Sequence, residues 1–262
     1  MKLLFVGDLI GSPGRKIVKK LLTGLIDRHA VDFCVANVEN AAGGFGITPD
    51  IMAELDPLPI DCYTSGNHIW DKKEGMALLD TDERILRPAN YPAGNPGRGV
   101  YVGETPGGVP VAVINLEGQV FMKALESPFR VADRLLESLP AAVKVIFVDF
   151  HGEATSEKLA LGFYLDGRVS AVIGTHTHVP TADERILPKG TAFQCDVGMT
   201  GPYESIIGFQ VDRVLHRFLM HTPSSFEVAK RDVRLAGTLI DIDEATGRAR
   251  SIERLLIQDA TV

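Results

Sequence analysis

The sequence predicts an α/β fold, in which short apolar strands alternate with amphipathic helices. Three observations indicate this class. Nearly continuous apolar runs recur along the chain, and several are followed by segments with helical spacing of apolar residues. Such runs are typical of parallel strands covered by helices on both faces of a sheet. Later runs come in pairs separated by turn residues, which predicts extra antiparallel strands in the same sheet or in a second one.

The first part of the chain predicts strand and helix in alternation. Lys2–Val6 is expected to be a buried strand, and Ser12-Pro13 supplies an N-cap and a first-turn proline for the helix that follows. The next expected elements are a strand over Asp32–Val38, a short helix from Thr48-Pro49 to Leu55, and a strand over Ile60–Thr64. This order predicts parallel neighbours, because each connection is long enough for a crossover.

The remainder of the chain mixes helices with strand pairs. The expected elements are a hairpin over Gly99–Leu116, a helix from Ser127-Pro128 to Leu139, a strand over Val143–Val148, a helix over Glu153–Leu165, a strand over Val169–Ile173, two short strands within Arg185–Val197, a helix over Val211–Met220 and a hairpin over Leu235–Leu256. Neither a linker nor an internal repeat interrupts this order, so residues 1–262 are expected to form a single domain.

Composition excludes several classes of protein. The net charge is −7, and the longest basic runs are pairs such as Lys19-Lys20, so non-specific nucleic-acid binding is not expected. Apolar runs stay far below the roughly 18 residues that span a bilayer, and the apolar N-terminal segment is too short for a signal peptide. We therefore expect a cytoplasmic protein with no membrane partner. The spacing of the three cysteines, Cys34, Cys62 and Cys195, fits neither a disulfide framework nor a metal knuckle. The sequence leaves open whether the protein forms a homo-oligomer.

Polar residues follow five of the predicted strands. Each residue alone is an ordinary turn residue or structural histidine. In an open parallel sheet, however, ligands bind beyond the carboxyl ends of the strands, so neighbouring strands would bring these side chains into one cleft. They are Asp8, Glu39, Asn40, Asn67, His68, His151, His176 and His178.

These residue types indicate a metal centre. Carboxylates, amide oxygens and imidazoles are suitable ligands for manganese, iron, cobalt or zinc. A mononuclear catalytic zinc site uses only three protein ligands, and the candidates exceed that number. The surplus predicts two metal ions that share a bridging carboxylate, an arrangement that serves displacement at phosphorus.

The motifs resemble those of the calcineurin-like metallophosphoesterases. Gly66-Asn67-His68, His151 and His176-Thr177-His178 occur in the order typical of that superfamily. The chain is most similar to its YmdB-like branch, over nearly the whole length. The stretches that carry this similarity are 7–11, 37–44, 149–158 and 174–181. The resemblance implies two stacked mixed β-sheets flanked by helices (αββα), with the metals at the strand ends.

Three departures from the broad superfamily pattern matter. The usual Asp-x-His is replaced by Asp8-Leu9-Ile10, and the missing imidazole is most simply replaced by the side-chain oxygen of Asn40. The usual bridging Asp is Glu39. Ile69 stands where an acidic residue normally follows Gly-Asn-His, which makes Asp71 the candidate group to orient His68.

The resemblance also implies a role for each site residue. Glu39 would bridge two metals, the first held with Asp8, Asn40 and His178, and the second with Asn67, His151 and His176. His68 would stay off the metals and protonate the leaving alkoxide. Iron or manganese is the expected metal, with zinc as an alternative. The expected activity is a phosphodiesterase acting on a small phosphodiester such as a 2′,3′-cyclic nucleotide, with broader phosphoesterase side activity.

Two other interpretations compete with that of a metal-dependent phosphodiesterase. Gly11-Ser12-Pro13-Gly14 follows a strand as a dinucleotide-binding loop would, but Leu9 occupies the first glycine position of that motif. A metal-binding regulatory or RNA-associated protein could use the same ligands without turnover. His68 favours the enzyme, because a pure binding site needs no histidine that stays off the metals.

Gly43-Gly44-Phe45-Gly46 is expected to be a flexible loop at the rim of the metal site.

Overall fold

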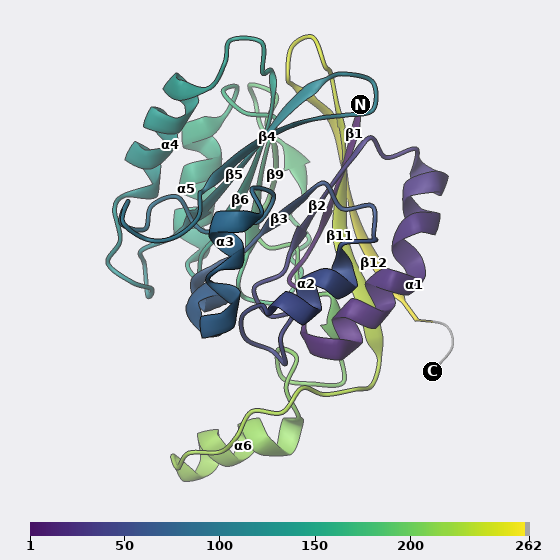
Figure 1. The fold of residues 1–262 in the computed structure, drawn as a ribbon, viewed down its shortest axis with the longest axis vertical. Coiled ribbons are helices and arrows are strands. Elements are labelled where there is room, and N and C mark those ends of the chain that lie inside the picture. Colours follow the sequence, from purple (N-terminus) through teal and green to yellow (C-terminus); the bar gives the residue numbers. More distant parts are fainter. Residues whose placement is uncertain (260–262) are drawn as a thin grey trace.

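Two six-stranded mixed sheets stack face to face in the computed structural model, which describes residues 1–259. Helices cover the outer faces of both sheets (Figure 1). The αββα fold class implied by the motifs is therefore confirmed. The predicted domain boundary at residue 262 lies outside the described residues.

The first sheet contains the N-terminal strands and the C-terminal hairpin. Its strand order is β10-β11-β1-β2-β3, and β12 pairs with β11. The strands β1, β2 and β3 are parallel, whereas β11 is antiparallel to both β1 and β12. The bounds are β1 (Lys2–Val6), β2 (Phe33–Asn37), β3 (Cys62–Thr64), β10 (Gly201–Pro202), β11 (Val233–Ile242) and β12 (Ala249–Gln258).

The second sheet is built from the middle of the chain, in the order β4-β5-β6-β7-β9-β8. Its four central strands are parallel, and the outer strands β4 and β8 are antiparallel to their neighbours. The bounds are β4 (Val100–Glu104), β5 (Pro110–Glu117), β6 (Val145–His151), β7 (Ala171–Thr175), β8 (Arg185–Ile186) and β9 (Ala192–Gln194).

Three apolar layers hold the sheets and helices together. Between the sheets, Phe5 of β1 packs on Phe147 of β6 with ring centroids 4.9 Å apart. The outer face of the first sheet packs on α1 and α2, and that of the second sheet packs on α4 and α5. The helices are α1 (Gly11–His29), α2 (Pro49–Leu55), α3 (Leu78–Thr81), α4 (Pro128–Ser138), α5 (Thr155–Leu165) and α6 (Val211–Met220), with 3₁₀ turns over Asn67–Trp70 and Lys73–Gly75.

One helix lies apart from these layers. Figure 1 shows α6 projecting from the body of the molecule, below the edge at which the parallel strands end. None of the helices in the described part of the chain is both long and apolar enough to cross a bilayer.

The five strands that carry polar ends are divided between the sheets, since β1, β2 and β3 belong to the first sheet and β6 and β7 to the second. One expectation needs correction. Ser12 is not the N-cap of α1, which begins at Gly11 after Ile10. The backbone N–H groups of Ile10 and Gly11 donate to the carbonyls of Thr200 and Asn40 at 2.9 Å each, so neighbouring loops satisfy these donors without a side-chain cap.

Candidate metal centre and active site

The parallel strands of both sheets end at the same edge of the molecule, and their polar residues meet there. The backbone N–H of His176, after β7, donates to Oδ2 of Asp8, after β1, at 3.1 Å. Nε2 of His151, at the end of β6, lies 3.3 Å from Oε1 of Glu39, after β2. Contacts of this kind link all eight predicted site residues, so the convergence comes from stacked sheets and not from adjacent strands of one sheet.

His151 is oriented by a buried hydrogen-bond chain. Oγ1 of Thr175 donates to Oδ1 of Asp149 at 2.7 Å, and Nδ1 of His151 lies 2.9 Å from the same hydroxyl oxygen. With the hydroxyl proton directed at Asp149, Nδ1 of His151 is the donor and Nε2 carries the lone pair. Metal-binding histidines are commonly held in this way, with the second ring nitrogen donating to a fixed acceptor.

The lone pair of His151 faces other acceptors. Its Nε2 lies 2.8 Å from Oδ1 of Asn67 and 3.0 Å from Nδ1 of His176. Nε2 of His176 lies 3.1 Å from Oε2 of Glu153 and can donate to it, so Nδ1 of His176 also presents a lone pair. Glu39, His151 and His176 offer donor atoms that all lie within 4.8 Å of one another. Such a cluster of electron-pair donors fits a bound cation.

Asp8, Asn40 and His178 form the adjoining part of the centre. Nδ1 of His178 donates to the carbonyl of Ile207 at 2.9 Å, which leaves the lone pair on Nε2, 3.9 Å from Oδ2 of Asp8. Oδ1 of Asp8 is buried and has no hydrogen-bond partner within residues 1–259, which is unusual for a carboxylate oxygen. These groups also fit a cation, which would satisfy the unpaired oxygen.

Asn40 turns its amide nitrogen toward the centre. Nδ2 lies 3.0 Å from Oε1 of Glu39 and 3.1 Å from Nε2 of His178. Donation to a carboxylate is the favoured arrangement where no cation is present. A half-turn of the amide would place its oxygen in the same position, as ligation requires.

Burial governs the electrostatics of the centre. It raises the pKa of Asp8 to about 8, with a further contribution from the charge of Asp196, and it raises the pKa of Glu39 well above its usual range together with the charge of Asp8. Burial also lowers the pKa of His151, and that of His176 to about 4. A bound cation would offset the effect of burial on the two acids, because it favours carboxylate anions, and it would bind the lone pairs of the neutral imidazoles.

An ion pair that the sequence did not reveal shapes the His-x-His turn. Nζ of Lys158 lies 2.7 Å from Oδ2 of Asp196, and both side chains are 1% exposed. Asp196 also accepts hydrogen bonds from the backbone N–H of Thr177 at 3.0 Å and of Gly198 at 2.9 Å. These bonds hold a backbone with positive φ on both sides of Thr177, 102° at His176 and 65° at His178. Lys158 looks like an ordinary helix residue in the sequence, so only the fold identifies it.

His68 differs from the other histidines. Its Nδ1 lies 2.8 Å from Oδ2 of Asp71, which agrees with the predicted orienting group. Its side chain is 30% exposed, and no hydrogen bond within residues 1–259 involves its Nε2. The preceding Gly66 is required by packing, because a Cβ there would come within 2.2–2.4 Å of the His151 ring.

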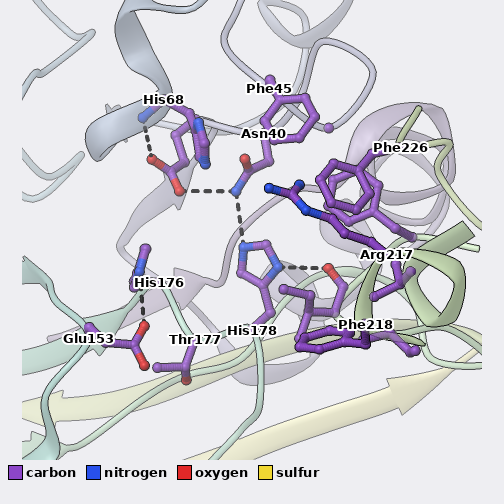
Figure 2. Close-up of a pocket in the computed structure, with 16 residues that line it drawn as sticks. Asn40, Phe45, His68, Glu153, His176, Thr177, His178, Arg217, Phe218 and Phe226 are labelled. Atoms are coloured by element: carbon purple, nitrogen blue, oxygen red, sulfur yellow. Dashed lines mark hydrogen bonds and ion pairs between the residues drawn. The ribbon is translucent and has the colours of Figure 1, made fainter. Parts of the chain in front are cut away.

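A pocket of about 750 Å³ opens over this centre. Figure 2 shows His176 and Glu153 on one side of it, and Phe45, Phe226 and Arg217 on the other. The predicted rim position of the Gly43–Gly46 loop is confirmed, since Gly44 and Phe45 line the pocket. The volume is in the range typical of sites for small-molecule ligands.

The match to known proteins agrees with this geometry. The family model described as "YmdB-like protein" matches residues 4–255. The chain belongs to the YmdB-like family. Its resemblance to that branch, first inferred from motifs, is therefore confirmed over nearly the full length.

Relatives of this YmdB-like protein cover it almost completely. A Bacillus subtilis protein named "2′,3′-cyclic-nucleotide 2′-phosphodiesterase" is 50% identical over 260 residues, which are 99% of this chain and 98% of the relative. A solved structure of a hypothetical protein from Thermus thermophilus has a TM-score of 0.93 and 44% identity, covering 99% and 100% of the two chains. A structure described as a novel phosphatase from Mycoplasma pneumoniae has a TM-score of 0.92 and 33% identity, covering 99% and 95%.

Proposed function

We propose that this protein is a metal-dependent phosphodiesterase that hydrolyses 2′,3′-cyclic nucleotides, with broader phosphoesterase side activity. The observation that carries the proposal is the combination of a cluster of buried metal donors with one more exposed His-Asp pair beside it. Metal donors alone would support binding, whereas a separate histidine able to donate a proton supports turnover. The name of the Bacillus subtilis relative supports the same substrate class.

The proposed cofactor is a pair of transition-metal ions, with iron or manganese expected and zinc as the alternative. Asp8, Asn40 and His178 would hold one ion, and Asn67, His151 and His176 would hold the other. Glu39 would bridge the two. When bound, paired ions of this kind lower the pKa of a water molecule and neutralise charge on phosphoryl oxygens. The unpartnered Oδ1 of Asp8 and the facing lone pairs of His151 and His176 support this assignment.

His68 would supply the proton to the leaving group. During hydrolysis a water oxygen forms a bond to phosphorus, the bond between phosphorus and O2′ breaks, and O2′ takes the proton from Nε2 of His68. The proton lost by the water passes to solvent, and His68 regains a proton from solvent. One water is consumed, and the product is a nucleoside 3′-monophosphate. Asp71 favours this role because its carboxylate, 2.8 Å from Nδ1, orients the ring.

The decisive experiment compares leaving groups in the His68→Ala variant. A ribose hydroxyl is a poor leaving group, whereas nitrophenolate leaves without a proton. The variant should lose about 10²–10⁴-fold in kcat on 2′,3′-cyclic AMP and much less on bis(p-nitrophenyl) phosphate.

Metal content and a matched variant make the comparison interpretable. His68→Ala should keep the metal content of the unaltered protein, and His29→Ala, at the end of α1, should behave like the unaltered protein on both substrates. Equal losses on the two substrates with metals retained would refute the general-acid role. Loss of metal would show that His68 is a ligand, and a fully active His68→Ala variant would refute the catalytic role altogether.

A further inference from the structure

Three phenylalanine rings line the outer side of the pocket, and we call Phe45, Phe209 and Phe226 the aromatic wall. The rings of Phe45 and Phe209 stack with centroids 5.2 Å apart and planes inclined by 20°. The ring of Phe226 continues the row, 5.1 Å from that of Phe209. The three residues come from the loop after β2 and from the segments on either side of α6, so the fold assembles the wall from distant parts of the chain.

The wall keeps apolar surface open to the pocket. Phe45 and Phe226 are only half-buried although both line the cavity, and Ile206 and Ile207 add aliphatic surface beside them. An apolar side next to a strongly polar centre is typical of a site whose ligand has one flat apolar part and one charged part. A nucleotide has this composition, whereas a simple phosphodiester does not.

The wall lies next to the proposed proton donor. The ring of Phe45 packs edge-on against that of His68, with centroids 4.9 Å apart. In a 2′,3′-cyclic nucleotide the leaving oxygen O2′ is joined to the base through C2′ and C1′ alone. A substrate with O2′ at Nε2 of His68 therefore has its base within reach of Phe45.

Arg217 adds a cation at the end of the wall. Its guanidinium lies over the ring of Phe226, 5.1 Å from the centroid, and Figure 2 shows it pointing from α6 into the pocket. Within residues 1–259, none of the carboxylates forms an ion pair with it. A planar guanidinium held on an aromatic face offers donors to the polar edge of a base.

We propose that the aromatic wall binds the nucleobase by stacking and thereby makes the enzyme selective for nucleotides over other cyclic phosphodiesters. This inference rests on the proposed function and names the substrate feature that its site would recognise. Stacking of a base on an aromatic side chain is sequence-tolerant, so we expect activity on several bases, with flat purines favoured.

The test uses a substrate pair that differs only in the base. The first substrate is 2′,3′-cyclic AMP, and the second is methyl riboside 2′,3′-cyclic phosphate, which keeps the reacting ring and lacks the base. Phe45→Leu and Phe226→Leu should each lower kcat/KM on the nucleotide by about 5–100-fold more than on the base-free substrate. Phe45→Tyr should retain the preference, because it keeps the flat ring.

Phe163→Leu provides the matched control. It removes a half-exposed ring of α5 that does not line the pocket, and it should change neither rate. Because Phe45 and Phe226 lie on separate segments, a folding defect in one variant leaves the other as an independent test. Equal losses on both substrates, or an unaltered enzyme that does not prefer the nucleotide, would overturn the inference.

Failure of the proposed function would give a different result. In that case the unaltered protein, loaded with metal, would hydrolyse neither substrate. Calorimetric titration with adenosine 3′-monophosphate then tests the wall directly: binding that is weakened by Phe226→Leu supports it, and absence of binding, or binding unaffected by Phe226→Leu and Phe45→Leu, refutes it.

Discussion

Replacement of Lys158 by methionine should test how the His-x-His turn is held. The change keeps an unbranched side chain in α5 but removes the ammonium group that lies 2.7 Å from Asp196. Asp196 would then be a buried carboxylate, 1% exposed, with two backbone N–H donors and no cation partner. Two hydrogen bonds do not replace the lost counter-charge.

The expected loss of stability is large. Removing one partner of a buried ion pair costs about 3–5 kcal/mol, because the other charge stays desolvated. For a domain of this size each kcal/mol lowers Tm by about 2–4 °C, so the drop should be about 6–20 °C. Metal affinity should fall as well, since the backbone N–H of Thr177, between His176 and His178, donates to the disturbed Asp196.

The measurement is thermal unfolding of metal-free and metal-loaded protein, together with metal content. Arg134→Met is the matched control, because Arg134 and Glu126 form a short ion pair on the surface, with both side chains at least half exposed. That change should barely alter Tm. The double variant Lys158→Met/Asp196→Asn should recover part of the loss, since no unpaired charge remains.

Either of two results would show that the ion pair between Lys158 and Asp196 does not stabilise the fold in this way. One is a Tm of Lys158→Met that lies no lower than that of Arg134→Met. The other is a double variant that is less stable than Lys158→Met alone, since that would mean the isolated charge of Asp196 is not the source of the loss.

Three further predictions concern the metal centre itself. In metal-free protein the pKa of Asp8 is raised to about 8. The folded state therefore holds a proton that the unfolded state has already lost near neutral pH. As this proton is released, the free energy of unfolding should fall by up to about 2 kcal/mol between pH 6.5 and 8. Saturating Mn²⁺ should abolish this fall in denaturant titrations, and a fall of equal size in Asp8→Asn would contradict the assignment. Gly66→Ala should displace the His151 ring and reduce metal content, whereas Gly24→Ala, where a Cβ has open space, should leave metal content unchanged. Glu39→Gln should reduce the content of both proposed ions, as measured by elemental analysis, and loss of one ion alone would refute the bridging role.

Much of the centre could be predicted from the sequence because its residues stand next to strands. A run such as Lys2–Val6 is recognisable from its own composition, and Asp8, two residues after it, is thereby placed at its carboxyl end. The chemistry of a donor set also follows from residue types alone. Asp71 was already a candidate to orient His68, since the two lie within one turn of chain.

The assignment of strands to sheets could not be predicted in this way. The register of β6 on β5, or of β1 on β11, depends on side chains that pack between the sheets. The residue types of an apolar run do not indicate which sheet the strand joins. Whether the five strands with polar ends are neighbours in one sheet stayed open in the sequence for this reason, and the structure divides them between two sheets whose strand ends meet.

Only the tertiary structure decided the contacts between distant segments. Lys158 and Asp196, or Phe45 and Phe209, carry no local signal that they meet, because each looks like an ordinary helix, loop or core residue in its own segment. The buried pair of Lys158 and Asp196 holds the turn that carries the metal ligands. The phenylalanines form the aromatic wall because the segments next to α6 lie against the loop after β2. Secondary structure and donor chemistry depend on neighbours in sequence, whereas desolvation and the shape of a pocket depend on neighbours in space.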